Sequence, residues 1–563
     1  MSSMQKFPST KYVVTGMLVA GAGLLLGAPA ATRDAASWDM ARAQLVAQQP
    51  SNITQAIVRW EELIRNDQLS FAAYSGFLLA YPEFPRASVL RARAETALER
   101  EAPAPEALVA YFDRNPPQGN LARARYALAL ATVQRPEARE MARSAWRGGR
   151  VGETSEAYLL GLFAGAFTQD DNDARMEALL WQGADHAAER HLPMTSPGKR
   201  DLFGKRLALL RDNLPQDDGI AIPRATLDQP GVVYNLVRYY RKKQQLQQAA
   251  AILASRPRFS SLPHDATDLV NEMLLAARAA GPRDAARIAA SVDDLFAPEE
   301  DISERSFRLR DKYTDLMWLG GTEALWKLGD GATAAPLFYR YGAAAKTPLT
   351  RAKGFYWAGR AARQANRGAD AERYFGMAAQ YADQYYGQLA LSALGRPMPP
   401  FAEVPQAAPT QEQRAQFNQS PLVKAMRAIA SARRDWRTER AFFEALADQA
   451  ETAEEMAMLA LLARELGLEE FAVVAGSTAP EKGLSGFERF AHPTVAVPLT
   501  ANWTMAHAIM RQESEFDQHR ESHAGARGMM QLMPGTAQEQ AGKMGLAYMS
   551  ASLVGDTQYN ITL

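Results

Sequence analysis

From about Ala31 to Gly395, apolar and polar positions recur in segments of roughly helical length that are rich in alanine, leucine and arginine. Short breaks of glycine, proline or aspartate separate these segments, as at Gly281–Asp284 and Leu328–Gly331. Paired helices with small residues at their contacts stack into superhelical arrays, so the pattern predicts an α-solenoid. No fixed repeat period is present, and a regular repeat array is therefore not predicted.

Prolines then crowd a short stretch of the chain: Pro397, Pro399, Pro400, Pro405 and Pro409. Because proline cannot continue a helix, a domain boundary is expected here. Apolar residues at helical spacing resume beyond it: Leu422, Met426 and Ile429, then Met456, Leu459, Ala463 and Leu466. Gly467 follows where a helix C-cap glycine would lie. We predict an α-superhelical domain over 31–400, a helical linker domain over 401–485 and a third domain over 486–563.

The third region is expected to open with a helix from about Trp503 to Glu513, with Asn502 as its N-cap. Apolar residues recur on one face at three- and four-residue steps: Ala506, Ile509, Met510 and Phe516. Glu513 falls at the border of this stripe and at the negative end of the helix dipole. Both effects favour the neutral acid, and a protonated carboxyl group can act as a general acid. The same residues are also compatible with an ordinary surface glutamate.

Turn chemistry follows that helix. Ser522–Gly528 combines small and polar residues with glycines that allow close backbone approach. Gln531 stands among methionines, and its amide needs hydrogen-bond partners if it is buried; a sugar acetamido or hydroxyl group could supply them. Thr536–Glu539 has the spacing of a capping box, which predicts that another helix begins there.

Composition narrows the function classes. The 563 residues carry a formal net charge of zero and no cysteine. The charge balance lacks the footprint of a general nucleic-acid binder, and disulfides, thiolate metal sites and cysteine nucleophiles are excluded. His519 and His523 flank Glu521, but the order of a zinc motif is missing. No metal and no cofactor are predicted.

The first thirty residues have the layout of a secretory signal peptide. Lys6 and Lys11 precede an uncharged, mostly apolar run from Val13 to Leu26, and Ala28-Pro29-Ala30 resembles a cleavage site. The run is shorter than the roughly 20 residues of a membrane span, so cleavage after Ala30 is favoured over an uncleaved anchor. We expect an exported mature chain without a membrane span.

Ordered motifs carry a specific resemblance. Arg511–Ser514, a nine-residue step from Glu513 to Ser522, and Gly525–Pro534 together resemble the signature of the lytic transglycosylase domain. Upstream, Tyr356–Ala361 and Tyr385–Ala390 resemble the end of the helical domain of soluble lytic murein transglycosylases. The resemblance implies an all-α chain. Its superhelical domain would be followed by a small helical linker domain and a goose-type-lysozyme-like catalytic domain.

The family's chemistry suggests roles for four residues. Glu513 would be the acid/base that cleaves the β-1,4 bond between N-acetylmuramic acid and N-acetylglucosamine without water, giving 1,6-anhydromuramyl products. Ser522, Gln531 and Met533 match positions that bind substrate in the family. The implied partners are peptidoglycan strands and other cell-wall enzymes in the periplasm.

Two alternatives remain open from the sequence. A lysozyme-like hydrolase would use a second carboxylate, such as Asp517. A scaffold without enzymatic activity would bind peptidoglycan or partner proteins through its helical domain. The sequence ends at Asn560–Leu563, which resembles the middle of a family motif. The catalytic domain is therefore expected to be incomplete at its C-terminus, which would put the activity of a chain of this length in question.

Overall fold

The computed structural model describes residues 35–212, 222–401, 407–432, 434–468, 470–499 and 501–563. Within these ranges the chain forms thirty α-helices and no β-strand, apart from two isolated bridges in the loop 521–532. The all-α prediction is confirmed. No helix in the described ranges has the length and apolar character needed to cross a membrane. The predicted signal peptide over 1–30 lies outside the described residues.

Twenty helices make up the first part of the described chain. Their bounds are α1 (Ala35–Ala47), α2 (Ile53–Arg65), α3 (Phe71–Ala80), α4 (Ala87–Ala97), α5 (Pro105–Phe112), α6 (Asn120–Thr132), α7 (Ala138–Arg147), α8 (Glu153–Phe163), α9 (Gln169–Trp181), α10 (Asp185–His191), α11 (Pro197–Leu210), α12 (Pro230–Lys242), α13 (Leu246–Ser255), α14 (Ala266–Ala279), α15 (Pro282–Ala290), α16 (Phe307–Thr322), α17 (Gly331–Ala343), α18 (Pro348–Gln364), α19 (Gly368–Ala379) and α20 (Tyr385–Ala393).

The remaining helices follow the proline-rich stretch. Their bounds are α21 (Gln411–Gln419), α22 (Pro421–Ser431), α23 (Trp436–Gln449), α24 (Ala453–Glu465), α25 (Glu470–Glu481), α26 (Glu488–Ala491), α27 (Trp503–Glu513), α28 (Pro534–Lys543), α29 (Ser552–Gly555) and α30 (Thr557–Thr562).

Local signals set many of these helix ends. Thr168, Thr410 and Thr452 each close a capping box at the start of α9, α21 and α24. At the end of α24, Gly467 has a φ of +70°. The amide of Leu468 donates to the Ala463 carbonyl at 2.9 Å, which is the long bond of a Schellman motif. The prediction of a C-cap glycine at Gly467 is confirmed.

Neighbouring helices of the first part approach closely where small residues face each other. A Cβ on Gly354 of α18 would lie 2.5 Å from the Cα of Gly342 on α17. Gly359, inside the motif Tyr356–Ala361, lies against the ring of Phe375, where a Cβ would come within 2.7 Å. The small residues expected at helix contacts are therefore present, and larger ones would push these helices apart.

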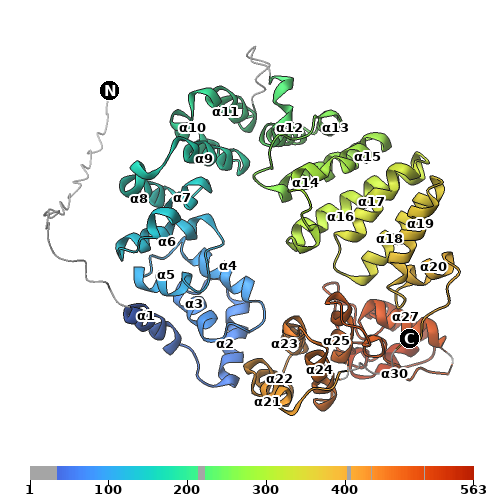
Figure 1. The fold of residues 1–563 in the computed structure, drawn as a ribbon. Helices are drawn as coiled ribbons and strands as arrows, with labels where there is room; N and C mark the ends of the chain where they lie inside the picture. Colours follow the sequence, from blue (N-terminus) through green and yellow to red (C-terminus); the bar gives the residue numbers. More distant parts are fainter. Residues whose placement is uncertain (1–34, 213–221, 402–406, 433, 469, 500) are drawn as a thin grey trace, which may run out of the picture.

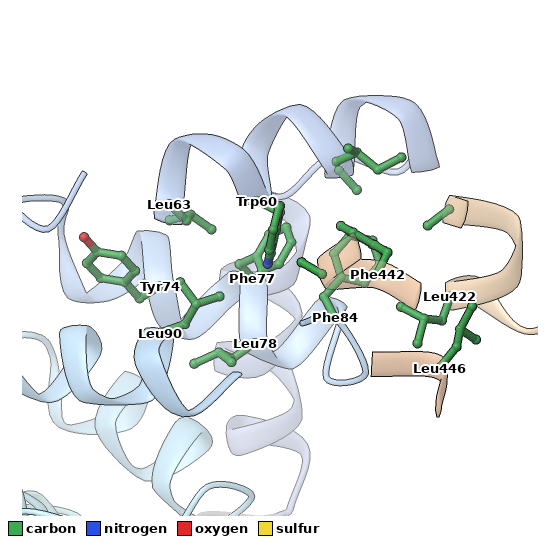
Figure 2. Packing of buried hydrophobic residues seen from close by; sticks show 14 of the residues in the cluster. Trp60, Leu63, Tyr74, Phe77, Leu78, Phe84, Leu90, Leu422, Phe442 and Leu446 are labelled. Atoms are coloured by element: carbon green, nitrogen blue, oxygen red, sulfur yellow. The ribbon is translucent and has the colours of Figure 1, made fainter. Parts of the chain in front are cut away.

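The helices α1–α20 trace an open arc, and α21–α25 lie between its two ends, so the chain closes into a ring (Figure 1). One apolar core joins the first helices of the arc to α22–α25, although they are far apart in the sequence. Figure 2 shows Phe442 of α23 beside Trp60 of α2, with Phe84 next to it. The ring is thus closed by packed aromatic side chains.

Candidate active site

Helix α27 places the predicted acid. Asn502 caps it, because its Oδ1 accepts a hydrogen bond of 3.0 Å from the amide of Met505. Ala506 and Met510 are the buried side chains of the helix, and they pack with Val473 of α25 and with Ile561 of α30. The predicted bounds and N-cap of this helix are both confirmed.

Glu513 is the last residue of α27, as expected, but its side chain is exposed. The apolar stripe buries positions 506 and 510 and leaves 513 at the rim, so the apolar half of the argument for a neutral acid is not met. The other argument for a neutral acid still applies, because Glu513 lies at the negative end of the helix dipole. An exposed carboxyl group can reach a long polymeric substrate without any opening of the protein.

The backbone turns sharply after Glu513. Ser514 is fully buried, and its hydroxyl donates to the carbonyl of Met510 at 3.1 Å and of Met529 at 2.8 Å. Glu515 and Phe516 then have φ values of +56° and +64°. Two successive non-glycine residues in this left-handed region cost about 1–3 kcal/mol each. Surrounding contacts must therefore hold the turn.

Arg440 of α23 supplies part of that support. Its Nη2 lies 2.5 Å from Oε2 of Glu515, and its Nη1 lies 3.8 Å from Oδ2 of Asp517. Arg511 and Arg520 add weaker pairs with Glu515, each at 3.9 Å. The turn after Glu513 is thus held by ion pairs with a residue of α23, a helix outside the third region.

Asp517 does not share a helical face with Glu513, because α27 ends before it. Its side chain is 3% exposed, and Oδ1 accepts a hydrogen bond of 2.9 Å from the amide of His519. Burial raises the pKa of Asp517, while the His519 amide and the Arg440 charge act in the opposite direction. Asp517 faces Arg440 in the protein interior, an arrangement that organises the end of the turn.

The loop after the turn carries the other predicted site residues. Ser522 is exposed, and its Oγ accepts a hydrogen bond of 2.9 Å from the amide of Ala526. Gln531 is half-buried with a φ of +50°, and its amide nitrogen donates to the carbonyls of Arg520 and Gly528 at 3.0 and 2.8 Å. Met533 is 44% exposed. All three stand on one loop, which the bond from Ser514 to Met529 ties to the end of α27.

The helix after this loop begins earlier than expected. The structure starts α28 at Pro534, with Met533 as N-cap and no side-chain cap. The capping box predicted at Thr536–Glu539 is therefore wrong. Proline at the first position of a helix already has the required φ and lacks only an amide that would be unpaired there, so the helix begins at Pro534.

The sequence of this region also matches a known protein family. Residues 499–563 match the profile of the family described as Transglycosylase SLT domain. This segment is similar to an SLT domain, and the name SLT domain is used for residues 499–563 below. No match was found among curated proteins.

Two solved structures are similar to the chain. An inactive mutant of lytic transglycosylase Slt from Pseudomonas aeruginosa aligns with a TM-score of 0.51 and 18% identity, over 93% of this chain and 84% of that one. The 70 kDa soluble lytic transglycosylase SLT70 from Escherichia coli aligns with a TM-score of 0.44 and 17% identity, over 93% and 83%. The first alignment shows that the chain shares the fold of that lytic transglycosylase. Together with the family match over 499–563, it confirms the resemblance drawn from the motifs.

Inside the SLT domain, Gly528 and Asn560 form a contact that sequence reasoning missed. Asn560 is fully buried; its Oδ1 accepts from the amide of Met530 at 2.8 Å, and its Nδ2 donates to the carbonyl of Arg527 at 3.1 Å. Gly528 has a φ of +75°, and a Cβ there would lie 2.0 Å from the carbonyl oxygen of Leu553. The buried Asn560 of α30 therefore fixes the loop that carries Gln531. The only signal in the sequence is its place in the family motif.

A mostly apolar pocket of about 360 Å³ lies between α27 and the preceding residues 492–494. Trp503 and His507 line it with their rings stacked 3.9 Å apart. The amide of Val495 donates to Nε2 of His507, and Nδ1 of His507 lies 2.8 Å from the Trp503 carbonyl, an arrangement that matches the tautomer with a proton on Nδ1. Glu513 does not line this pocket. The described residues hold no group of three or more metal-binding side chains.

Proposed function

We propose that the chain is a peptidoglycan lytic transglycosylase in which Glu513 is the catalytic acid/base. The observation that carries the proposal is the place of this carboxyl group, exposed at the C-terminus of α27 in an SLT domain and followed by a pinned turn. The predicted roles of Ser522, Gln531 and Met533 in substrate binding belong to the same proposal.

The reaction needs one carboxyl group acting twice. Glu513 gives its proton to the glycosidic oxygen as the bond from the muramyl anomeric carbon to that oxygen breaks. The carboxylate then takes the proton of the muramyl 6-hydroxyl. As it does so, the oxygen of that hydroxyl bonds to the anomeric carbon and closes the 1,6-anhydro ring. Glu513 ends in its starting state, and no water is consumed.

The loop supports substrate binding in three ways. Met533 offers an exposed apolar side chain, and Ser522 is exposed beside the turn. Gln531 uses its amide nitrogen to brace the loop, which leaves its carbonyl oxygen for an N–H of the substrate. A residue of this kind both shapes the loop and contacts the sugar.

The hydrolase alternative would place the second carboxylate at Asp517. Its burial against Arg440 argues against that role, since a general base must reach a water on the substrate. The scaffold alternative predicts binding to peptidoglycan without any product.

The domain organisation and location complete the proposal. A superhelical domain over 31–400, a linker domain over 401–485 and a catalytic domain over 486–563 would act in the periplasm after export by the signal peptide over 1–30. Ser477 of α25 accepts a hydrogen bond of 3.0 Å from Arg511, which supports a catalytic domain seated on the linker domain.

Digestion of purified sacculi followed by mass spectrometry tests the reaction. We expect 1,6-anhydromuramyl products, each lighter by one water than a hydrolase product. Glu513→Gln should lower the rate by about a hundredfold or more, since a general acid contributes that much. The matched control is Glu539→Gln on α28, where the exposed Glu539 pairs with Lys543. This variant should retain full activity. Reducing, non-anhydro products would refute the transglycosylase, and an active Glu513→Gln would refute the acid.

A further inference from the structure

The turn that follows Glu513 has a conformation that its own residues do not favour. Glu515 and Phe516 are both left-handed, and neither is glycine. Any relaxation of this turn toward ordinary φ values moves the residues on either side of it, and Glu513 is separated from it only by Ser514. The position of the Glu513 carboxyl group therefore depends on what holds the turn.

The strongest holding contacts come from Arg440. This side chain is 17% exposed and meets Glu515 at 2.5 Å and Asp517 at 3.8 Å, so one guanidinium group spans the turn. The other pairs of Glu515, with Arg511 and Arg520, are both longer. Arg440 also pairs through Nε with Glu444 on its own helix at 2.7 Å, and the Glu444 side chain is 47% exposed.

Helix α23, which carries Arg440, is itself fixed at the closure of the ring. Arg434, just before this helix, pairs with Glu61 of α2 at 2.8 Å, and Thr438 donates to the same carboxylate at 3.2 Å. Phe442 packs between the rings of Trp60 and Phe84, with centroids 5.0 Å from each. Arg440 thus contacts the turn from a helix that is held in place by its packing against the first helices of the chain.

We infer that Arg440 is a positioning residue that holds Glu513 in its working orientation through Glu515 and Asp517. Arg440 does not touch the reacting atoms; it acts through the turn. The inference rests on the proposed function, because it assigns Arg440 to the orientation of the acid proposed there. It also links ring closure by α23 to the catalytic helix.

Arg440→Met tests the inference, since it keeps the aliphatic stem and removes the charge. We expect kcat on glycan strands to fall about ten- to hundredfold, as for a small displacement of a catalytic group, with KM within about twofold of the wild type. Glu515→Gln, which leaves α23 intact, should also lower kcat. The variant that combines Arg440→Met with Glu515→Gln should have a kcat no lower than that of Arg440→Met alone. Arg440→Lys should recover part of the loss.

Two matched controls remove comparable contacts elsewhere. Arg427→Met deletes the pair of Arg427 with Glu465 between α22 and α24. Glu444→Gln removes the charge of Glu444, which pairs with Arg440 from the same helix and not from the turn. Both should keep kcat within about twofold of the wild type. A general loss of stability would lower kcat in Arg427→Met as well, and such a result would overturn the inference.

Hydrogen exchange of residues 510–520 supplies a readout that does not depend on activity. Arg440→Met should speed exchange of these amides and leave α1–α20 unchanged. If the wild type yields no anhydro product, the proposed function fails, and exchange still decides whether Arg440 holds the turn. If the wild type is active but Arg440→Met changes neither kcat nor exchange, the positioning role is refuted while the proposed function stands.

Discussion

The indole ring of Trp60 on α2 meets the phenyl ring of Phe442 on α23 edge to face, with centroids 5.0 Å apart and planes at 73°. Phe84 contacts the same phenyl ring at 5.0 Å from another side. All three side chains are buried, and Nε1 of Trp60 donates to the carbonyl of Pro85 at 2.8 Å. This contact joins the first helices of the arc to the segment that follows its end.

Phe442→Ala should destabilise the protein by about 3–5 kcal/mol, because it removes a fully buried ring and leaves a cavity between Trp60 and Phe84. Urea unfolding followed by circular dichroism measures the loss. Phe307→Ala is the matched control: this ring is 74% exposed at the start of α16, so its removal should cost no more than about 0.5 kcal/mol. Equal effects of the two substitutions would show that the aromatic contact does not close the ring.

Glu439 of α23 should make stability depend on pH. Burial, together with the smaller effects of the charges of Glu470, Asp435 and Asp517, raises the pKa of Glu439 from 4.5 to about 7. The folded protein therefore binds this proton more tightly than the unfolded chain. The contribution to stability is complete below about pH 4.5, falls as pH rises toward 7, and is lost above it.

Glu439→Gln removes this titration. As the pH rises from about 5 to about 8, the free energy of unfolding of the variant should increase by about 1–2 kcal/mol relative to that of the wild type, after allowance for solvent screening. Chemical unfolding at the two pH values measures the change. Glu465→Gln is the control, because the hydrogen bond to Arg427 lowers the pKa of Glu465 and keeps it ionised over this range. A gain for Glu439→Gln that is the same at both pH values would contradict the prediction.

The sequence predicts most of the fold and only part of the site. Helices such as α27 follow from apolar spacing and from local caps such as Asn502, which act over a few residues and can be read directly. The pairing of Trp60 with Phe442 and of Arg440 with Glu515 depends on how the arc curves, and no local pattern encodes that. The sequence leaves the exposure of Glu513 open for the same reason, since it depends on what packs around the helix end.

Gln531 combines two roles that can be separated by a pair of substitutions. Its φ of +50° suits glycine, and its amide nitrogen braces Arg520 and Gly528. Gln531→Ala loses the two hydrogen bonds and keeps the strained backbone. Gln531→Gly loses the same bonds and relieves the strain, so it should be more stable than the alanine variant by about 0.5–1 kcal/mol.

Activity on glycan strands separates bracing from binding at Gln531. If the side chain contacts the substrate, both variants should lose activity to the same extent despite their different stability. Recovery of activity in Gln531→Gly, in step with its stability, would show that the residue only braces the loop. Thermal melting and initial rates on sacculi, measured on the same preparations, provide the comparison.

Asn560→Asp should loosen the loop of the SLT domain by changing one atom. The Met530 amide can still donate to Oδ1, but the second carboxylate oxygen now faces the carbonyl of Arg527, which had accepted a hydrogen bond from Nδ2. The loss of that bond and the burial of a charge should cost about 1–3 kcal/mol and lower activity on sacculi. Asn502→Asp is the matched control, because the Asn502 side chain only accepts from the Met505 amide and aspartate caps a helix equally well. Equal stability of the two variants would mean that Asn560 does not hold the loop.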